Sequence, residues 1–213
     1  MPDPVAVQDL VANARRFLTE LAANNTREWF QGEKHRYDSE LKRPAERLLG
    51  DLAPHLEALA GAPVRQKLFR PHRDIRFSTD KTPYHTHLHL AWSIQDGRGW
   101  YFGLSPSYAT AGAGIMAFDK VQIDRWRDAV AGPRGTALTG ILDQIGGRID
   151  PPELKRVPPP FPGDHPHHAL LRRKGLTVWV DDLAPVIAAD PFGGLSGAFE
   201  RLSPVMTWLG DTL

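Results

Sequence analysis

The chain has 213 residues, a length that fits one domain and is ample for a hydrophobic core. Its 26 Lys and Arg residues are balanced by 25 Asp and Glu residues, and this near-neutral total argues against a general nucleic-acid coat protein. The sequence contains no cysteine, which excludes disulfides, zinc–thiolate sites and cysteine nucleophiles.

The first sixty residues predict three helices. Residues 5–23 carry apolar side chains at three- and four-residue steps, and Asn24 is suited to end that helix. Thr26 is suited to the N-cap of a second helix, and Pro44 to the first turn of a third. Pro54 is expected to break or kink the third helix, because proline cannot donate the backbone hydrogen bond.

The next segment, 64–118, predicts an antiparallel sheet, since no helix-sized crossover separates its strand-like runs. The expected strands are 66–77, 87–95, 99–106 and 112–118. Asp96 and Gly97 form a good hairpin turn between the second and third strands. Pro71 lies inside the first run, which favours an edge strand or a bulge there.

The remainder of the chain returns to helical spacing, with Asp119 as an expected N-cap. Helices are predicted at 119–131, 136–146, 183–190 and 195–209, a strand at 176–180, and a proline-rich loop at 157–166. The fold class is therefore α+β: N-terminal helices, a central and mainly antiparallel sheet, and C-terminal helices. We expect a single domain over 1–213, with a helical part at 1–60, a sheet core at 64–118 and a helical part at 119–213.

The sequence also predicts where the protein resides. Its N-terminal residues lack the basic start and apolar core of a secretory signal. No apolar stretch approaches the ~20 residues that span a bilayer. We therefore expect a soluble cytoplasmic protein with no membrane partner.

A run of charge between Arg65 and Lys81 is the strongest functional signal. Six cationic side chains lie there, opposed only by Asp74 and Asp80, which gives a local charge of +4. The planar fork of arginine is suited to bidentate binding of phosphate or carboxylate. The predicted ligand-binding residues are Arg70, Arg73, Asp74, Arg76, Lys81 and Tyr84.

Strand alternation over 66–77 would divide this run between two faces. One face would carry Arg70, His72, Asp74 and Arg76, and the other Phe69, Arg73, Ile75 and Phe77. Asp74 would then stay ionised between two arginines and orient them. No glycine-rich phosphate loop accompanies the run, which argues against a P-loop nucleotide site.

Three histidines, His85, His87 and His89, are spaced so that a strand would point all of them to one face. Two such imidazoles can bind a metal, but no acidic residue lies within the run, so we predict no metal site. His165 lies in the proline-rich loop and could reach the pocket. The candidate catalytic residues are Asp74, Tyr84, His87 and His165.

The charged run also follows the pattern R-x-x-R-D-x-R-F-x-x-[DN]-K-x-x-Y. The matching residues are Arg70, Arg73, Asp74, Arg76, Phe77, Asp80, Lys81 and Tyr84. On these positions the chain resembles a bacterial family of conserved uncharacterised proteins, domain of unknown function 2461. Pro159 and Pro160 depart from the family, which often has arginine and glycine there, and His85 and His89 lie outside its pattern. The resemblance implies no known activity, so it marks the site and not the function.

Three interpretations stay open at this point. In the first, the cluster binds a phosphate- or carboxylate-bearing ligand, and Tyr84 or His87 transfers a proton if a reaction follows. In the second, the Arg–Asp cluster is internal bracing of a structural or protein-interaction module, and Asp74→Ala would destabilise the fold strongly. The third is nucleic-acid binding, which the near-neutral total charge disfavours. The sequence does not identify a cofactor or an oligomeric state.

Overall fold

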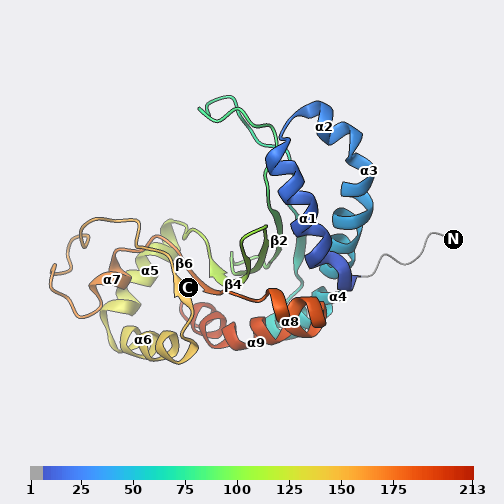
Figure 1. The fold of residues 1–213 in the computed structure, drawn as a ribbon. Helices are drawn as coiled ribbons and strands as arrows, with labels where there is room; N and C mark the ends of the chain where they lie inside the picture. Colours follow the sequence, from blue (N-terminus) through green and yellow to red (C-terminus); the bar gives the residue numbers. More distant parts are fainter. Residues whose placement is uncertain (1–6) are drawn as a thin grey trace.

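A six-stranded sheet with the order β1-β2-β3-β4-β6-β5 lies at the centre of the structure, a computed structural model that describes residues 7–213. The strands are β1 (Arg65–Leu68), β2 (Leu88–Ser93), β3 (Gly99–Leu104), β4 (Ala109–Ile115), β5 (Arg148–Ile149) and β6 (Leu176–Val180). Every neighbouring pair is antiparallel. Helices precede β1 and follow β4, and β5 and β6 come between further helices, so the predicted α+β class is confirmed (Figure 1).

The helices lie close to the predicted ranges. They are η1 (Val7–Asp9), α1 (Leu10–Ala23), α2 (Arg27–Gly32), α3 (Lys34–Arg36), the π-helical η2 (Tyr37–Lys42), α4 (Arg43–Ala60), α5 (Lys120–Ala131), α6 (Pro133–Ile145), α7 (His168–Leu171), α8 (Ala184–Ala189) and α9 (Pro191–Gly210). Thr26 and Asp119 cap α2 and α5 through their side chains, as predicted. Residues 5 and 6 of the first expected helix lie outside the described residues.

The predicted start of the third helix is confirmed, but the break expected within it is absent. Pro44 lies in the first turn of α4, which begins at Arg43 directly after the π-helical η2. Pro54 does not break α4, which continues to Ala60. Pro54 lies on the exposed side of α4, whereas Leu52 and Leu56 on its other side are fully buried. Burial of this leucine side offsets the backbone hydrogen bond that Pro54 cannot donate.

One face of the sheet is covered by helices. α9 packs on β4, and α4 packs on β1 and β2; Figure 1 shows α9 running beneath β4. Trp92 is fully buried in this layer, where its indole Nε1 donates to the Leu49 carbonyl of α4 at 2.9 Å. Its ring meets Phe199 of α9 edge-on, with the ring centroids 5.7 Å apart. One hydrophobic cluster therefore joins the N-terminal helices, the sheet and α9.

The second helical group, α5 to α7, packs against the C-terminal end of α9. Trp126 on α5 is fully buried, and its indole Nε1 donates to the Leu170 carbonyl of α7 at 3.0 Å. Its ring lies 5.6 Å from that of Trp208 on α9. In Figure 1 this group lies at the opposite end of the molecule from α1 and α2. No helix within residues 7–213 is both long and apolar enough to cross a membrane.

The strand predictions were right for the hairpin and wrong at two boundaries. β2 and β3 are joined through Asp96 and Gly97, and Gly97 takes the positive φ of 90° that the turn requires. The strand expected over 66–77 ends at Leu68, because Pro71 cannot extend the ladder and the chain leaves the sheet. β1 is nevertheless an edge strand, as that proline indicated. The strand expected over 112–118 lies at Ala109–Ile115.

Candidate functional site

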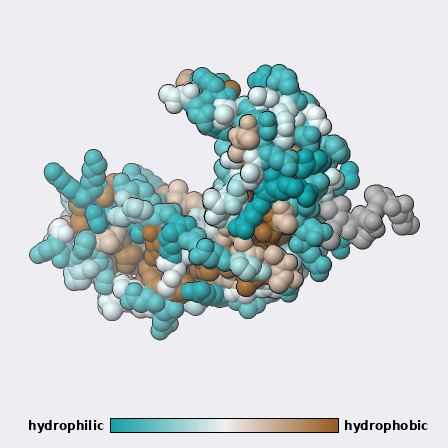
Figure 2. All heavy atoms as spheres, in the orientation of Figure 1, coloured by the Kyte–Doolittle hydropathy of each residue, from teal (hydrophilic) through white to brown (hydrophobic). Residues whose placement is uncertain are grey.

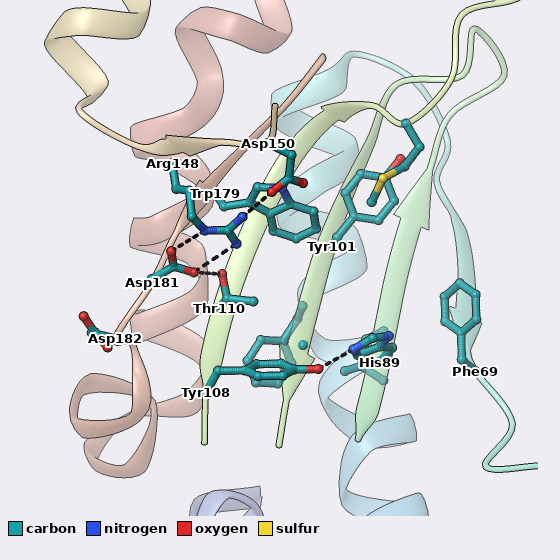
Figure 3. Close-up of a pocket in the computed structure, with 14 residues that line it drawn as sticks. Phe69, His89, Tyr101, Tyr108, Thr110, Arg148, Asp150, Trp179, Asp181 and Asp182 are labelled. Carbon is teal, nitrogen blue, oxygen red and sulfur yellow. Dashed lines mark hydrogen bonds and ion pairs between the residues drawn. The ribbon is translucent and has the colours of Figure 1, made fainter. Parts of the chain in front are cut away.

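The second face of the sheet is open. Because side chains alternate along a strand, the residues next in sequence to those on the covered face point to this open face. His89, Tyr101 and Trp179 come from β2, β3 and β6, and Figure 3 shows them on the side of the sheet opposite the helices. Register places Gly112 of β4 between Tyr101 and Trp179, so these strands form one continuous surface.

This surface forms a pocket of about 740 Å³, which we call the aromatic pocket. Its lining comprises Phe69, His89, Leu90, Tyr101, Phe102, Gly103, Tyr108, Thr110, Met116, Arg148, Asp150, Trp179, Asp181 and Asp182. The rings of Tyr101 and Trp179 lie 6.1 Å apart at 44°. The volume falls in the range typical of small-molecule sites, which are also mostly apolar with a few polar groups.

Two glycines form part of the floor of the aromatic pocket. A Cβ atom at Gly112 would lie 2.3 Å from the indole of Trp179, so only glycine lets that ring lie against the sheet. A Cβ atom at Gly103 would lie 3.1 Å from the ring of Tyr108 and 3.3 Å from that of His89. The glycines therefore let the flat rings of Trp179, Tyr108 and His89 lie close to the backbone.

A charged group closes one end of the aromatic pocket. The Nε of Arg148 donates to Asp181 at 2.7 Å, and its Nη1 donates to Asp150 at 2.5 Å. The Thr110 hydroxyl also donates to Asp181, at 2.6 Å, and the guanidinium lies 5.7 Å from the Trp179 ring centroid. Hydrogen bonding from Arg148 lowers the pKa of Asp181, so this carboxyl is ionised at neutral pH.

The titratable groups at the centre of the aromatic pocket are neutral at pH 7. Burial raises the pKa values of Tyr101 and Tyr108, so both hydroxyls keep their protons. Burial lowers the pKa of His89, which favours the neutral imidazole. His89 Nε2 and the Tyr108 hydroxyl lie 2.9 Å apart and share a hydrogen bond. Such a pair can donate or accept a proton at a bound ligand.

A second pocket, of about 480 Å³, adjoins the first, and we call it the basic pocket. It is lined by Lys67, Leu68, Phe69, Arg70, His72, Asp74, His85, His87 and His89. Phe69 and His89 line both pockets, so the two lie side by side. Lys67 extends over the Phe69 ring, with its Nζ 4.3 Å from the ring centroid.

The prediction that His85, His87 and His89 share one face is confirmed, since all three line the basic pocket. The rings of His87 and His89 stack at 3.8 Å, and those of His85 and His87 lie 4.7 Å apart. Burial, together with the neighbouring imidazoles, lowers the pKa of His87 to about 4. Within residues 7–213 no group of three or more His, Asp or Glu side chains is placed to hold a metal ion.

The run between β1 and β2, residues 69–87, forms a projecting arm with a braced base (Figure 1). Arg73 donates to Asp80 at 2.5 Å, to the Thr82 hydroxyl, and to the Thr82 carbonyl at 3.1 Å. The amide of Arg73 also donates to the Pro83 carbonyl at 2.9 Å. These bonds tie the outgoing and returning halves of the arm together.

Tyr84 anchors the arm to the N-terminal helices. Its side chain is buried, and its ring stacks on Phe30 of α2 with the centroids 4.0 Å apart. The side chain of Asn25 forms two hydrogen bonds with the Tyr84 backbone. Its Nδ2 donates to the Tyr84 carbonyl at 2.9 Å, and the Tyr84 amide donates to its Oδ1 at 3.1 Å. Tyr84 therefore holds the arm in place and lies in the core and not in either pocket.

The outer part of the arm is exposed. Arg76 Nη2 and Asp74 Oδ2 form an ion pair at 2.7 Å, and this hydrogen bonding lowers the pKa of Asp74. Lys81 Nζ donates to the Ile75 carbonyl at 3.0 Å. The side chain of Phe77 is 96% exposed at this end.

The structure does not gather the six predicted ligand-binding residues into one pocket. Arg70 and Asp74 line the basic pocket, and the candidate catalytic His87 lies beside them. Arg73 and Tyr84 contact other parts of the arm and the core, and Arg76 and Lys81 bond within the exposed end. His165 lines a separate hollow against α6, together with His167.

Sequence reasoning missed the charged end of the aromatic pocket. Arg148 and Asp181 are far apart in the sequence and meet only because β5 pairs with β6. The two-residue strand β5 has no recognisable pattern of its own. A signal did exist at Gly112, since a glycine inside a strand indicates close approach of another group. The group that approaches is Trp179.

Comparison with known proteins agrees with the family resemblance. No curated protein matches the chain. A family model described as "Conserved hypothetical protein (DUF2461)" matches residues 13–208, which include the arm, every strand and both pockets. The chain therefore belongs to the family of conserved hypothetical proteins DUF2461.

Proposed function

We propose that the protein binds a small phosphate- or carboxylate-bearing ligand in the basic pocket on the open face of the sheet. The observation that carries this proposal is the position of Lys67 and Arg70. Both line the basic pocket, and within residues 7–213 neither forms an ion pair with a carboxylate. The neighbouring cations of the arm, Arg73 and Arg76, are already paired with aspartates.

The surroundings of these two cations also suit an anion. Lys67 and Arg70 are both exposed, so an anion can reach them directly from solvent, and arginine can bind phosphate or carboxylate in a bidentate way. His85, His87 and His89 add imidazole N–H donors along the same wall. Asp74 is the carboxylate in the lining, and Arg76 already bonds to both of its oxygens.

Isothermal titration with inorganic phosphate, pyrophosphate and citrate tests this proposal. We expect at least one of these anions to bind the wild-type chain, and Lys67→Gln and Arg70→Gln to weaken that binding about tenfold each, the usual size for a lost charged hydrogen bond. Lys42→Gln is the matched control, because it removes one positive charge from an exposed ion pair on the helix surface. The proposal fails if no anion binds, or if the control loses as much affinity as Arg70→Gln.

Arg73 is a poor position for this test, although sequence reasoning assigned it to the ligand. Its guanidinium bonds to Asp80 and Thr82, so a substitution would disturb the arm before it reported on a ligand. Arg70 has no such bond within the described residues, which makes it the better choice.

One observation favours the alternative of a protein-interaction module. The arm is internally braced, and it presents Phe77, a large apolar side chain that is almost fully exposed. A second copy of the chain is the partner to test first. Sedimentation velocity at increasing concentration should then show self-association that Phe77→Ser abolishes, while phosphate binding stays unchanged. A monomer at all concentrations would remove this alternative.

A further inference from the structure

The aromatic pocket is larger than a phosphate or a small carboxylate requires. Its volume of about 740 Å³ lies directly beside the basic pocket, and the two share Phe69 and His89. A ligand whose anionic group meets Lys67 and Arg70 can therefore extend into the aromatic pocket. What it places there must fit the walls of that pocket.

Those walls suit a flat ring. Tyr101 of β3, Trp179 of β6 and Tyr108 of the turn before β4 all present their rings to the pocket (Figure 3). Gly103 and Gly112 carry no side chain, so the rings of Tyr108 and Trp179 lie close to the sheet and line the pocket as flat surfaces. Aromatic side chains bind planar groups by stacking, and this contact is the common means of holding nucleic-acid bases.

The charged end of the aromatic pocket suits the edge of a hydrogen-bonding ring. Three of the five N–H groups of Arg148 bond to Asp150 and Asp181, which leaves two N–H donors and further carboxylate acceptor positions for a ligand. Asp182 lines the same end and, within residues 7–213, forms no ion pair. Donors and acceptors placed together in this way can recognise the mixed pattern on a base edge, as carboxylates and arginine do for nucleobases.

We propose that the ligand is a nucleoside phosphate, with its base in the aromatic pocket and its phosphate in the basic pocket. This inference rests on the proposed function, since the basic pocket must first bind the anion. The sugar would cross the boundary formed by Phe69 and His89. The chain would hold the phosphate with side chains and not with a glycine-rich loop.

Isothermal titration of the full chain with four compounds tests the inference: AMP, adenosine, ribose 5-phosphate and inorganic phosphate. GMP, CMP and UMP are titrated alongside AMP, because the base itself is unidentified. We expect at least one nucleotide to bind ten times more tightly than ribose 5-phosphate and than adenosine. Trp179→Ala should weaken nucleotide binding about tenfold and leave binding of inorganic phosphate unchanged, whereas Arg70→Gln should weaken both.

Two further variants control the experiment. Phe77→Leu removes an exposed aromatic ring outside both pockets and should leave every affinity unchanged. If Trp179→Ala fails to fold, Tyr101→Leu removes a ring of the same pocket at similar volume, and it should weaken nucleotide binding in the same way.

The outcomes separate this inference from the proposed function. If inorganic phosphate or ribose 5-phosphate binds as tightly as every nucleotide, the inference is overturned and the proposed function stands. If adenosine binds and no phosphate compound does, the proposed function fails, and the inference fails with it. Nucleotide binding that Trp179→Ala and Tyr101→Leu leave unchanged would also overturn the inference, since the base would then lie elsewhere.

Discussion

The two faces of the sheet are built from alternate residues of the same strands, but one face is covered by helices and the other is open. The covered face carries Trp92, Trp100 and Phe102 packed under α4 and α9. The open face carries Tyr101 and Trp179, which are only partly buried and have Gly112 between them. Both faces therefore carry aromatic rings, but only the covered face has helices packed against it.

This difference separates stability from function. An aromatic ring on the covered face contributes the free energy of its burial, because it is removed from water on every side. A ring on the open face is supported from below and exposed above, and so it remains available to a ligand. Substitutions on the two faces should therefore change different measurements.

The largest effect is expected from Trp92→Ala, on the covered face. Its indole is fully buried and its Nε1 bonds to the Leu49 carbonyl, so truncation leaves a cavity and an unsatisfied acceptor. We expect a loss of about 3–5 kcal/mol in the free energy of unfolding, measured with urea. Trp179→Ala should cost clearly less, because that ring is partly exposed. Equal losses would contradict the division between the faces.

Tyr84→Ala should rank second, since this residue joins the arm to the covered core. The ring is 3% exposed and stacks on Phe30. We expect about 3 kcal/mol of destabilisation by urea unfolding, together with faster proteolysis of the arm. Tyr84→Phe keeps the stacked ring and is the control, with stability close to wild type. A loss as large in Tyr84→Phe would mean that the hydroxyl, and not the stacked ring, anchors the arm.

Gly112→Ala tests the floor of the open face. The added Cβ would lie 2.3 Å from the Trp179 indole, so the ring must move away from the sheet. We expect about 1–3 kcal/mol of destabilisation and a clear change in tryptophan fluorescence. Gly50→Ala is the control, because a Cβ there meets nothing within 4 Å and Gly50 lies within the helix α4. A Gly112→Ala chain with wild-type stability and fluorescence would show that Trp179 does not lie on this glycine.

The stacked histidines predict a pH dependence of stability. Burial lowers the pKa of His87 from 6.5 to about 4, so the unfolded chain binds more protons than the folded one between these values. His85 and His89 shift in the same direction. The free energy of unfolding should therefore fall as the pH drops from about 6.5 towards 4, because protonation favours the unfolded chain in this window.

Substitution of His87 by asparagine checks this pH dependence. His87→Asn should flatten the curve of unfolding free energy against pH between 6.5 and 4. His35→Asn, at an exposed position on α3, should not flatten it. An unchanged slope in His87→Asn would show that these imidazoles are not the groups that titrate.

Local patterns predicted the covered half of the molecule well. Apolar spacing predicted α1 and the C-terminal helices, capping residues at Thr26 and Asp119 placed two helix starts, and the turn at Gly97 placed the β2–β3 hairpin. These features depend on neighbours a few residues away, which the sequence shows directly. The extent of the domain and the cytoplasmic location stay predictions.

The open face is the side of the sheet that the helices leave uncovered. No local sequence pattern shows which side this is. Alternation along β3 marks Tyr101 and Phe102 as opposite, but it does not say which one the helices cover. Arg148 reaches Asp181 only through the pairing of β5 with β6. The charged run was identified as a motif, yet its residues divide between the basic pocket, the bracing of the arm and its exposed end.

The smallest effect on stability is expected from Asp74→Asn. The interpretation of internal bracing expects the opposite, a large loss of stability when the Asp74 carboxylate is removed. Asp74 pairs with Arg76 at an exposed position, and such ion pairs contribute little to stability. Unfolding midpoints of the variant and the wild type should therefore agree closely. Phosphate binding should become slightly tighter, because Asp74 lines the basic pocket and its carboxylate interacts with the charge of Arg70. Weaker binding would instead mean that Asp74 orients the arginine for the ligand, and a lower unfolding midpoint would restore the bracing role.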